Sequence, residues 1–302
     1  MSKLPVLIYP DMPELREALS AYEVVTPTSP RADVSAAVVA GHHLPNEVVL
    51  AFPGLRLLAC VGVGLEGIDL PFLRERGITV TNGVNINHED VADIAMGLLI
   101  GVARRFSEGQ RVLRAGEWVG ALAVPPQRRL RGMKMGIVGM GAIGQAIAER
   151  AKVCGLEIAW TGPNRKPAIP FPYQLDLIEL ARWADVLAIA ARGEKSTDRL
   201  IRADVIDALG PDGILINVSR GSVVDEDALI AALRGGRLWG AGLDVFMQEP
   251  TPPQRWRDVP NVMLTPHLGG GTRESLEGAA LNVYENLRRH FAGEPLLTPV
   301  HR

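Results

Sequence analysis

The sequence predicts an α/β protein of two domains, each built on a parallel β-sheet that is doubly wound by helices. Short runs rich in β-branched residues alternate with helix-like segments over residues 1–82, and a second such series runs over residues 133–267. The 302 residues suit two domains, at roughly 100 to 200 residues per domain. With 47% hydrophobic and 22% charged residues, the chain is globular and can bury a sizeable core.

The first series contains strand candidates separated by helix candidates. Strands are expected at "PVLIY", "AAVVA", "LRLLAC" and "ITVTN", and helices at "PELREALSAY" and "DLPFLRERG". A long helix candidate follows at residues 88–106, and a connector that contains Gly and Pro occupies residues 114–132. The closing segment, residues 272–293, is an amphipathic helix with no strand after it. We therefore expect this last helix to return and pack on the first domain.

The overall charge favours a small-molecule partner. The formal net charge is −2 and the sequence pI is about 6.3, so no positive field attracts nucleic acid or an acidic membrane surface. The N-terminal segment lacks the apolar core of a signal peptide, and the best apolar run is shorter than a membrane span, which predicts a cytoplasmic protein. The two cysteines, Cys60 and Cys154, fit a reducing compartment and lack metal-ligand spacing, so we expect no metal.

The segment "MGIVGMGAIGQAIAER" carries the strongest chemical signal, the pattern GxGxxG. Gly139 permits a tight turn, Gly141 lets the backbone approach a pyrophosphate, and Gly144 lets helix and strand pack closely. Ala142 and Ile143 open the helix, whose N-terminus attracts phosphate charge. An ordinary glycine turn is the alternative, but the apolar strand before it and the Ala-rich helix after it favour a dinucleotide-binding loop.

The turn after the next strand, in "WTGPNRKP", indicates which dinucleotide is bound. In this fold the second strand ends about 20 residues beyond the glycines, where a carboxylate usually binds the adenine ribose of NAD. Here the turn holds Asn164, Arg165 and Lys166 and has no Asp or Glu. A carboxylate would repel the 2′-phosphate of NADP, whereas Arg and Lys donate charge-assisted hydrogen bonds to it. The alternative is that this is an ordinary basic turn exposed to solvent. The absence of a carboxylate and the presence of two basic residues together favour NADP(H) as the cofactor.

Later strand candidates are followed by side chains suited to catalysis. Arg220 follows one apolar strand, Asp244 and Glu249 follow another, and His267 follows a third. The carboxyl ends of parallel strands converge on one ligand crevice. There a guanidinium can bind a carboxylate, an imidazole can transfer a proton, and a carboxylate can hold the imidazole. Taken singly, each residue could be an ion-pair partner, a turn residue or a core histidine; together they predict a reaction centre.

The chain resembles the D-isomer-specific 2-hydroxyacid dehydrogenases over nearly its whole length. The resemblance is carried by "GIVGMGAIG", "NVSRGSVVDEDAL", "GAGLDVFMQEP" and "TPHLGG". Within that family, "VGVGLEGIDLPFLRERGITVTN", "VADIAMGLLIGVARR" and the carboxylate-free turn look most like the NADPH-dependent glyoxylate/hydroxypyruvate reductases and the hydroxyphenylpyruvate reductases. Those relatives often have Arg where Pro163 stands, so the phosphate contacts would rest on the three residues that follow it.

This resemblance implies a domain organisation and an activity. A flavodoxin-like, substrate-binding domain would comprise residues 1–88 and 271–302, and a Rossmann-fold NADP-binding domain would comprise residues 89–270, with the active site in the cleft between them. The enzyme would reduce a small 2-oxo acid to the D-2-hydroxy acid with hydride from NADPH. The backbone amides of Val63 and Gly64 would hold the substrate carboxylate.

The resemblance also assigns roles to the side chains at the strand ends. Arg220 would bridge the carboxylate and the carbonyl oxygen of the 2-oxo acid, and His267 would donate the proton. Glu249 would orient His267 and stabilise its protonated form, and Asp244 would face the nicotinamide side of the cofactor. The assignment is chemically coherent, because hydride addition builds negative charge on an oxygen that Arg220 stabilises while His267 protonates it.

A homodimer is expected as well. The resemblance implies a homodimer built largely through the nucleotide-binding domain. In addition, the longer connector counted from Arg104 to Gly132 is too long for a compact loop. The connector is rich in apolar side chains, including Trp118, Val119, Leu122 and Val124. These features suggest an arm packed on a second subunit.

Other functions remain open at this point. Hydroxyphenylpyruvate or 2-ketogluconate would be alternative substrates within the same family, because the Arg220 chemistry recognises any 2-oxo acid. Candidates for selecting among them are Trp118, Trp256 and Phe52, each of which could equally be a packing residue. A dinucleotide-sensing corepressor would use the same glycine loop, but it does not require the set of Arg220, Glu249 and His267. The presence of all three side chains in this sequence favours an enzyme.

Overall fold

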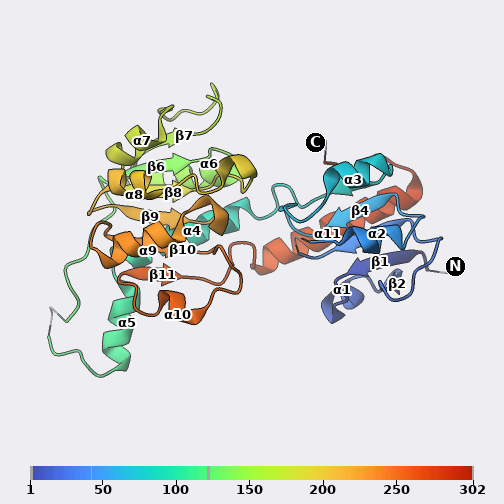
Figure 1. The fold of residues 1–302 in the computed structure, drawn as a ribbon, viewed down its shortest axis with the longest axis horizontal. Helices are drawn as coiled ribbons and strands as arrows, with labels where there is room; N and C mark the ends of the chain where they lie inside the picture. The colour runs from blue at the N-terminus through green and yellow to red at the C-terminus, as the bar shows by residue number, and fades with distance from the viewer. Residues whose placement is uncertain (1–2, 42, 121–122, 301–302) are drawn as a thin grey trace. The chain divides into compact units, whose positions relative to one another are not determined.

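The computed structural model describes residues 3–41, 43–120 and 123–300, and the chain divides into two compact units (Figure 1). The first unit comprises residues 1–87 and 273–302, and the second comprises residues 88–272. The divisions lie one and two residues from those expected from the sequence. Among the described helices, none is long and apolar enough to cross a membrane.

The first unit is a five-stranded parallel sheet with the strand order β2-β1-β3-β4-β5. The strands are β1 (Pro5–Tyr9), β2 (Glu23–Val25), β3 (Ala36–Val39), β4 (Leu57–Cys60) and β5 (Thr79–Thr81). The helices are α1 (Pro13–Ala18), α2 (Asn46–Leu50), α3 (Leu70–Glu75) and α11 (Arg273–Ala292). This order is that of flavodoxin-like sheets, and it confirms the predicted class for the unit.

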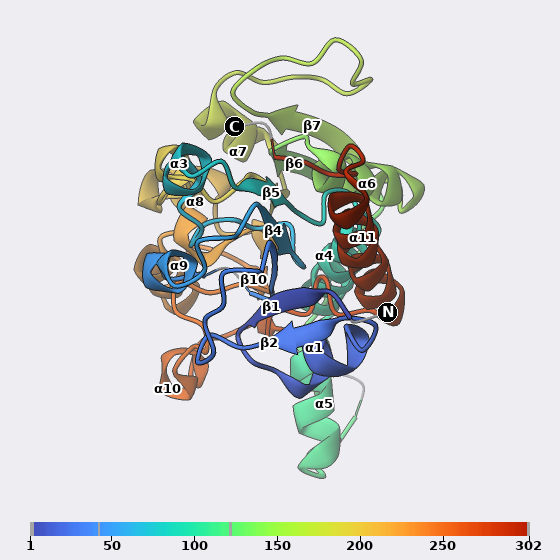
Figure 2. The ribbon, with the colours of Figure 1, turned by 90° about the vertical axis from the view of Figure 1, so that its right-hand side faces the viewer.

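Helices cover both faces of this sheet. Residues of α2 and α3, such as Val49 and Leu73, belong to one buried cluster, whereas Val283 and Leu287 of α11 belong to a cluster on the other face. Figure 2 shows α3 and α11 on opposite flanks of the blue strands. The helix expected at residues 272–293 therefore returns to the first unit, as predicted.

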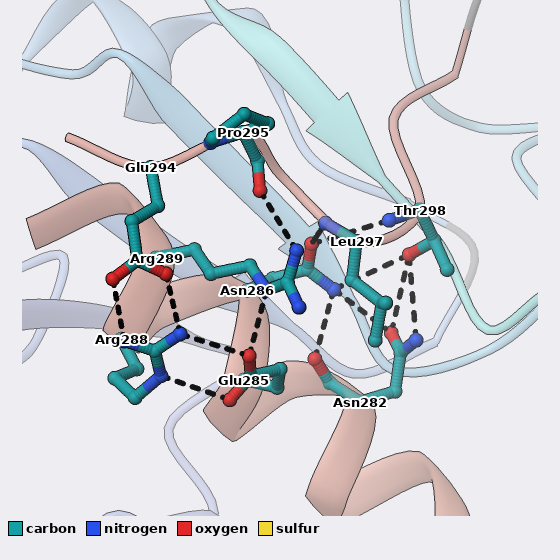
Figure 3. Close-up of polar contacts among 9 residues, drawn as sticks. All are labelled: Asn282, Glu285, Asn286, Arg288, Arg289, Glu294, Pro295, Leu297 and Thr298. Carbon is teal, nitrogen blue, oxygen red and sulfur yellow. Dashed lines mark hydrogen bonds and ion pairs between the residues drawn. The ribbon is translucent and has the colours of Figure 1, made fainter. Parts of the chain in front are cut away.

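The end of α11 and the segment after it are joined by polar contacts, drawn in Figure 3. The buried side chain of Asn286 accepts hydrogen bonds from the backbone N–H groups of Leu297 (2.9 Å) and Thr298 (3.4 Å). Beyond them, the backbone N–H of Val300 donates to the carbonyl of Val80 at 2.8 Å. These contacts hold the C-terminal segment against the unit in which the chain begins.

The second unit is a six-stranded parallel sheet with the order β11-β10-β9-β8-β6-β7. Its strands are β6 (Lys134–Val138), β7 (Glu157–Thr161), β8 (Val186–Ile189), β9 (Ile214–Asn217), β10 (Gly240–Leu243) and β11 (Val262–Leu264). Its helices are α4 (His88–Ala103), α5 (Phe106–Arg114), α6 (Ala142–Val153), α7 (Leu177–Trp183), α8 (Ala203–Leu209), α9 (Glu226–Arg234) and α10 (Pro253–Trp256). It is the Rossmann-type domain that the glycine loop predicted.

Two buried clusters lie on the two faces of the second sheet. One joins α4 and α6 to the sheet and includes Leu99 and Ile147, and the other joins α7, α8 and α9 to it and includes Leu180, Ile206 and Leu229. The central strands β8 and β9 are buried at every residue, as expected for parallel strands covered on both faces. The strand order reverses at β6, which lies between β7 and β8. A ligand crevice is expected at such a switch point.

The connector between α4 and β6 contains a helix that the sequence reasoning did not assign. Helix α5 follows Arg105, whose left-handed backbone (φ 53°) breaks the chain direction after α4. In Figures 1 and 2, α5 points away from the six-stranded sheet. Trp118 and Val119 beyond it are 69% and 91% exposed, and Leu122 lies outside the described residues.

Candidate active site

The glycine loop lies between β6 and α6, where the sequence placed it. Gly139 has φ +95°, a left-handed conformation that favours glycine, and a Cβ on Gly144 would lie 2.1 Å from the Gly139 carbonyl oxygen. A Cβ on Gly141 would have no atom within 4 Å, although Gly141 directly precedes the first turn of α6 at Ala142 and Ile143. The loop therefore leaves open space beside the N-terminus of α6, a helix of 12 residues, as the binding of a pyrophosphate requires.

The basic turn is tied to this loop. Lys166 donates from Nζ to the backbone carbonyl of Met140 at 2.8 Å, so the turn after β7 contacts the glycine loop directly. Asn164 and Arg165 are exposed in the same turn. The contact gives Lys166 a structural role that sequence reasoning did not foresee. Its ammonium group has two further N–H donors.

Arg220, Glu249 and His267 follow three neighbouring strands, because β9, β10 and β11 lie side by side in that order. His267 and Glu249 are in direct contact, with 2.7 Å between imidazole Nδ1 and carboxylate Oε2. Their side chains are 35% and 37% exposed, so the pair is open to a ligand or to solvent. The second oxygen of Glu249 accepts from the backbone N–H of Phe246 at 3.0 Å.

The turn that carries His267 is built around the buried carboxylate of Asp244. That carboxylate accepts from the backbone N–H groups of Leu268 (2.7 Å) and Gly269 (2.8 Å) and from the hydroxyl of Thr265 (2.6 Å). His267 itself has a left-handed backbone at φ 53°, an uncommon conformation for a non-glycine residue. Asp244 thus holds the histidine turn, a role that the sequence reasoning missed; its nicotinamide contact stays a prediction.

Arg220 lies in the segment after β9, beyond Val218 and Ser219, and is positioned by its neighbours. Asn217 donates from its side chain to the Arg220 carbonyl at 3.0 Å, and the Arg220 guanidinium donates to the Ser219 carbonyl at 2.7 Å. A Cβ on Gly193 would lie 2.5 Å from Cγ of Arg220. Gly193 therefore admits the arginine stem, and nothing in the local sequence around it signals this role.

Val63 and Gly64 belong to the first unit, in the loop after β4. The side chain of Asn82 donates to the Val63 carbonyl at 2.8 Å, and the backbone N–H of Gly83 donates to the Gly62 carbonyl at 3.0 Å. The loop is thus held from the end of β5. The role of its amides in binding a carboxylate stays a prediction.

The aromatic candidates for substrate selection are placed differently from one another. Phe52 is 1% exposed and Trp256 is 5% exposed, and both belong to hydrophobic cores. They pack inside their units and are withdrawn as selectivity candidates. Trp118 is exposed in the connector after α5. Within the part of the chain that the structure describes, no group of three or more His, Cys, Asp or Glu side chains could hold a metal.

Known proteins share both the sequence and the fold. Residues 96–269 match the family described as D-isomer specific 2-hydroxyacid dehydrogenase, NAD binding domain. Over 255 residues the chain is 42% identical to hydroxyphenylpyruvate reductase of Plectranthus scutellarioides and 41% identical to glyoxylate/hydroxypyruvate reductase A of Arabidopsis thaliana, covering 84% of this chain and 81% of each relative.

A solved structure agrees over almost the full length. The NADPH-dependent glyoxylate/hydroxypyruvate reductase of Sinorhizobium meliloti, in complex with NADP and malonate, matches with a TM-score of 0.90 and 37% identity. The match covers 99% of this chain and 97% of that one. The chain therefore belongs to the D-isomer specific 2-hydroxyacid dehydrogenase family.

Proposed function

We propose that this enzyme reduces a small 2-oxo acid of the glyoxylate/hydroxypyruvate class to the D-2-hydroxy acid, with NADPH as its cofactor. The observation that carries the proposal is the 2.7 Å contact between His267 and Glu249, at strand ends next to the one that leads to Arg220. The names of the Arabidopsis relative and of the S. meliloti structure support the substrate class. Hydroxyphenylpyruvate is the second candidate, because the Plectranthus relative is named for it.

The glycine loop would hold the dinucleotide, which supplies the hydride that adds to the carbonyl carbon. Arg220 would bind the substrate carboxylate and carbonyl oxygen and stabilise the negative charge that grows on that oxygen. With Nδ1 of His267 held by Glu249, the other ring nitrogen, Nε2, is the one that would pass its proton to the oxygen. Solvent then returns a proton to the imidazole. The amides of Val63 and Gly64 would add donors for the carboxylate.

The preference for NADPH is supported by the composition of the turn after β7. Arg165 and Asn164 are exposed there, and the turn has no carboxylate to repel a 2′-phosphate. The S. meliloti relative, solved with NADP, agrees with this choice. The contact of Lys166 with Met140 suggests that Arg165 supplies most of the selectivity.

A panel of substrates tests the proposal. Purified protein is assayed with glyoxylate, hydroxypyruvate, hydroxyphenylpyruvate and 2-ketogluconate, each with NADPH and with NADH, and the values of kcat/KM are compared. We expect turnover with NADPH, the highest value for glyoxylate or hydroxypyruvate, and a D-configured product wherever the product is chiral. Absence of turnover with every 2-oxo acid and both cofactors would contradict the proposed function and favour a sensing role.

A homodimer and a cytoplasmic location belong to the same proposal. The exposed apolar side chains of Phe106, Leu113, Trp118 and Val119 lie in and just after α5, which suits an arm that packs on a second subunit. Sedimentation at micromolar protein concentration should give the mass of a dimer, and the mass of a monomer would contradict the proposed homodimer. Cys60 and Cys154 are both free thiols, which suits a reducing compartment.

A further inference from the structure

Glu226 is a buried carboxylate that the reaction described above does not use. It is the first residue of α9, yet the capping of that helix is done by Asp225, whose side chain accepts from the backbone N–H of Ala228 at 3.1 Å. The side chain of Glu226 is 6% exposed and contacts two other segments. One oxygen accepts from the backbone N–H of Met247 at 2.5 Å, and the other accepts from Nε of Arg255 at 2.7 Å.

Arg255 fixes this carboxylate from the short helix α10. Its guanidinium donates both to Glu226 and to Asp227, the second contact at 2.9 Å. Burial lowers the pKa of Arg255, but its hydrogen bonds to Glu226 and Asp227 outweigh that effect and raise the pKa above its ordinary value. A charged carboxylate held in this way is a firm acceptor for the Met247 amide.

The Met247 amide lies in the turn that carries Glu249. Two successive N–H groups in this turn are held by different carboxylates, because Phe246 donates to Glu249 and Met247 donates to Glu226. The turn is also packed against the segment after Arg220, since a Cβ on Gly221 would lie 1.8 Å from the Phe246 carbonyl carbon. Glu226 is therefore the polar anchor of a turn whose other side is close-packed backbone.

We propose that Glu226, held by Arg255, is a positioning residue for the proton transfer: it fixes the turn at Met247 so that Glu249 meets the His267 imidazole. Without this anchor the turn can shift, and the contact between Glu249 and His267 loosens. Misplacement of a reacting group by about 1 Å lowers turnover by roughly 10²-fold. The inference rests on the function proposed above.

The first test separates turnover from cofactor binding. Glu226→Ala should lower kcat roughly 10- to 100-fold with the best 2-oxo acid. The dissociation constant for NADPH should stay within about twofold of the wild-type value, since the glycine loop is untouched. Asp227→Ala is the matched control: Asp227 is the next residue of α9 and also binds Arg255, but no contact joins it to Met247. Its kcat should equal that of the wild type.

The second test asks whether Glu226 acts through Glu249. The kcat values of Glu226→Ala, Glu249→Gln and the double variant form a cycle. If Glu226 positions Glu249, its removal should cost about twofold or less when Glu249 has already been replaced, because there is no longer a carboxylate to position. A residue that only stabilises the fold would cost the same factor in both backgrounds. If Glu226→Ala does not fold, the cycle is run with Glu226→Gln, which keeps an oxygen acceptor but loses the charge that binds Arg255.

Equal losses in both backgrounds would overturn the inference, as would native turnover of Glu226→Ala or an equal loss in Asp227→Ala. These outcomes are distinct from a failure of the proposed function. If the proposed function fails, the wild-type protein itself turns over no 2-oxo acid. If only this inference fails, the wild type is active and the kcat values of the variants show the failure.

Discussion

The carboxyl edge of the six-stranded sheet and the C-terminal end of α11 both contain dense groups of charged side chains, but the two groups differ in burial and in partners. At the sheet edge, Asp244 and Glu226 are 1% and 6% exposed, and both accept from backbone N–H groups. At the end of α11, the side chains of Glu285 and Glu294 are 31% and 46% exposed and pair with arginines, as Figure 3 shows.

The difference separates two uses of a carboxylate. A buried carboxylate that accepts from backbone amides fixes the path of a loop, and its loss leaves those amides without a partner in a region closed to water. An exposed ion pair is screened by solvent and salt and constrains little. We therefore expect residues of the first kind to affect both stability and catalysis, and residues of the second kind to affect neither strongly.

The largest effect is expected for Asp244→Ala. It removes the acceptor for the amides of Leu268 and Gly269, and each hydrogen bond to a charged group contributes about 1.5 to 3 kcal/mol. The free energy of unfolding, measured in urea, should fall by about 3 to 5 kcal/mol. Asp204→Ala is the control, because Asp204 also accepts from a backbone N–H, that of Val205, but is exposed. A similar loss in both variants would remove the distinction drawn here.

The glycine loop gives the next largest effect and separates packing from binding. A methyl group on Gly144 meets the Gly139 carbonyl at 2.1 Å, so Gly144→Ala should lower the free energy of unfolding by about 1 to 3 kcal/mol. Gly141→Ala places its methyl group in open space and should leave stability unchanged. It should instead raise the NADPH dissociation constant about tenfold or more, equivalent to ~1.4 kcal/mol. Unchanged NADPH binding in Gly141→Ala would place the pyrophosphate elsewhere.

The basic turn offers a smaller and more selective effect. Arg165→Ala should raise the KM for NADPH about tenfold, because it removes one exposed charge-assisted contact, and should leave the KM for NADH unchanged. Lys166→Ala should weaken both cofactors, since Lys166 also holds the Met140 carbonyl of the glycine loop. High salt should penalise NADPH more than NADH. If Arg165→Ala affects both cofactors equally, or if the native enzyme prefers NADH, this turn does not bind the 2′-phosphate.

The smallest effect is expected at the end of α11. Hydrogen bonds from Arg288 and Arg289 lower the pKa of Glu285 from 4.5 to about 2. A carboxylate with a lowered pKa stabilises the folded state at pH values above its pKa in the unfolded state. For Glu285 this stabilisation is lost as the pH falls from about 4.5 towards 2. Glu285→Gln should therefore be slightly less stable than the wild type at pH 7, and the difference should vanish in acid and in high salt. A large difference in the free energy of unfolding at pH 7 would contradict the contrast between buried carboxylates and exposed ion pairs.

The sequence predicted the two sheets and the residues at their carboxyl edges because both depend on strong local patterns. Apolar runs and GxGxxG placed β6 and α6, and single polar residues after apolar strands marked Arg220, Glu249 and His267. It did not predict the roles of Gly193 and Glu226, because these roles depend on residues that are distant in the chain. Helix α5 was missed because its start depends on the left-handed backbone of Arg105.

Replacement of His267 by Asn tests the central claim most directly. Asn lacks a group that can donate the proton, while the glycine loop that would hold the cofactor is unchanged. Titration should give an NADPH dissociation constant close to that of the wild type, and steady-state assays with glyoxylate should give a kcat lower by roughly 10² to 10⁴-fold. Turnover near the wild-type rate would show that His267 is not the proton donor and would contradict the account of this site.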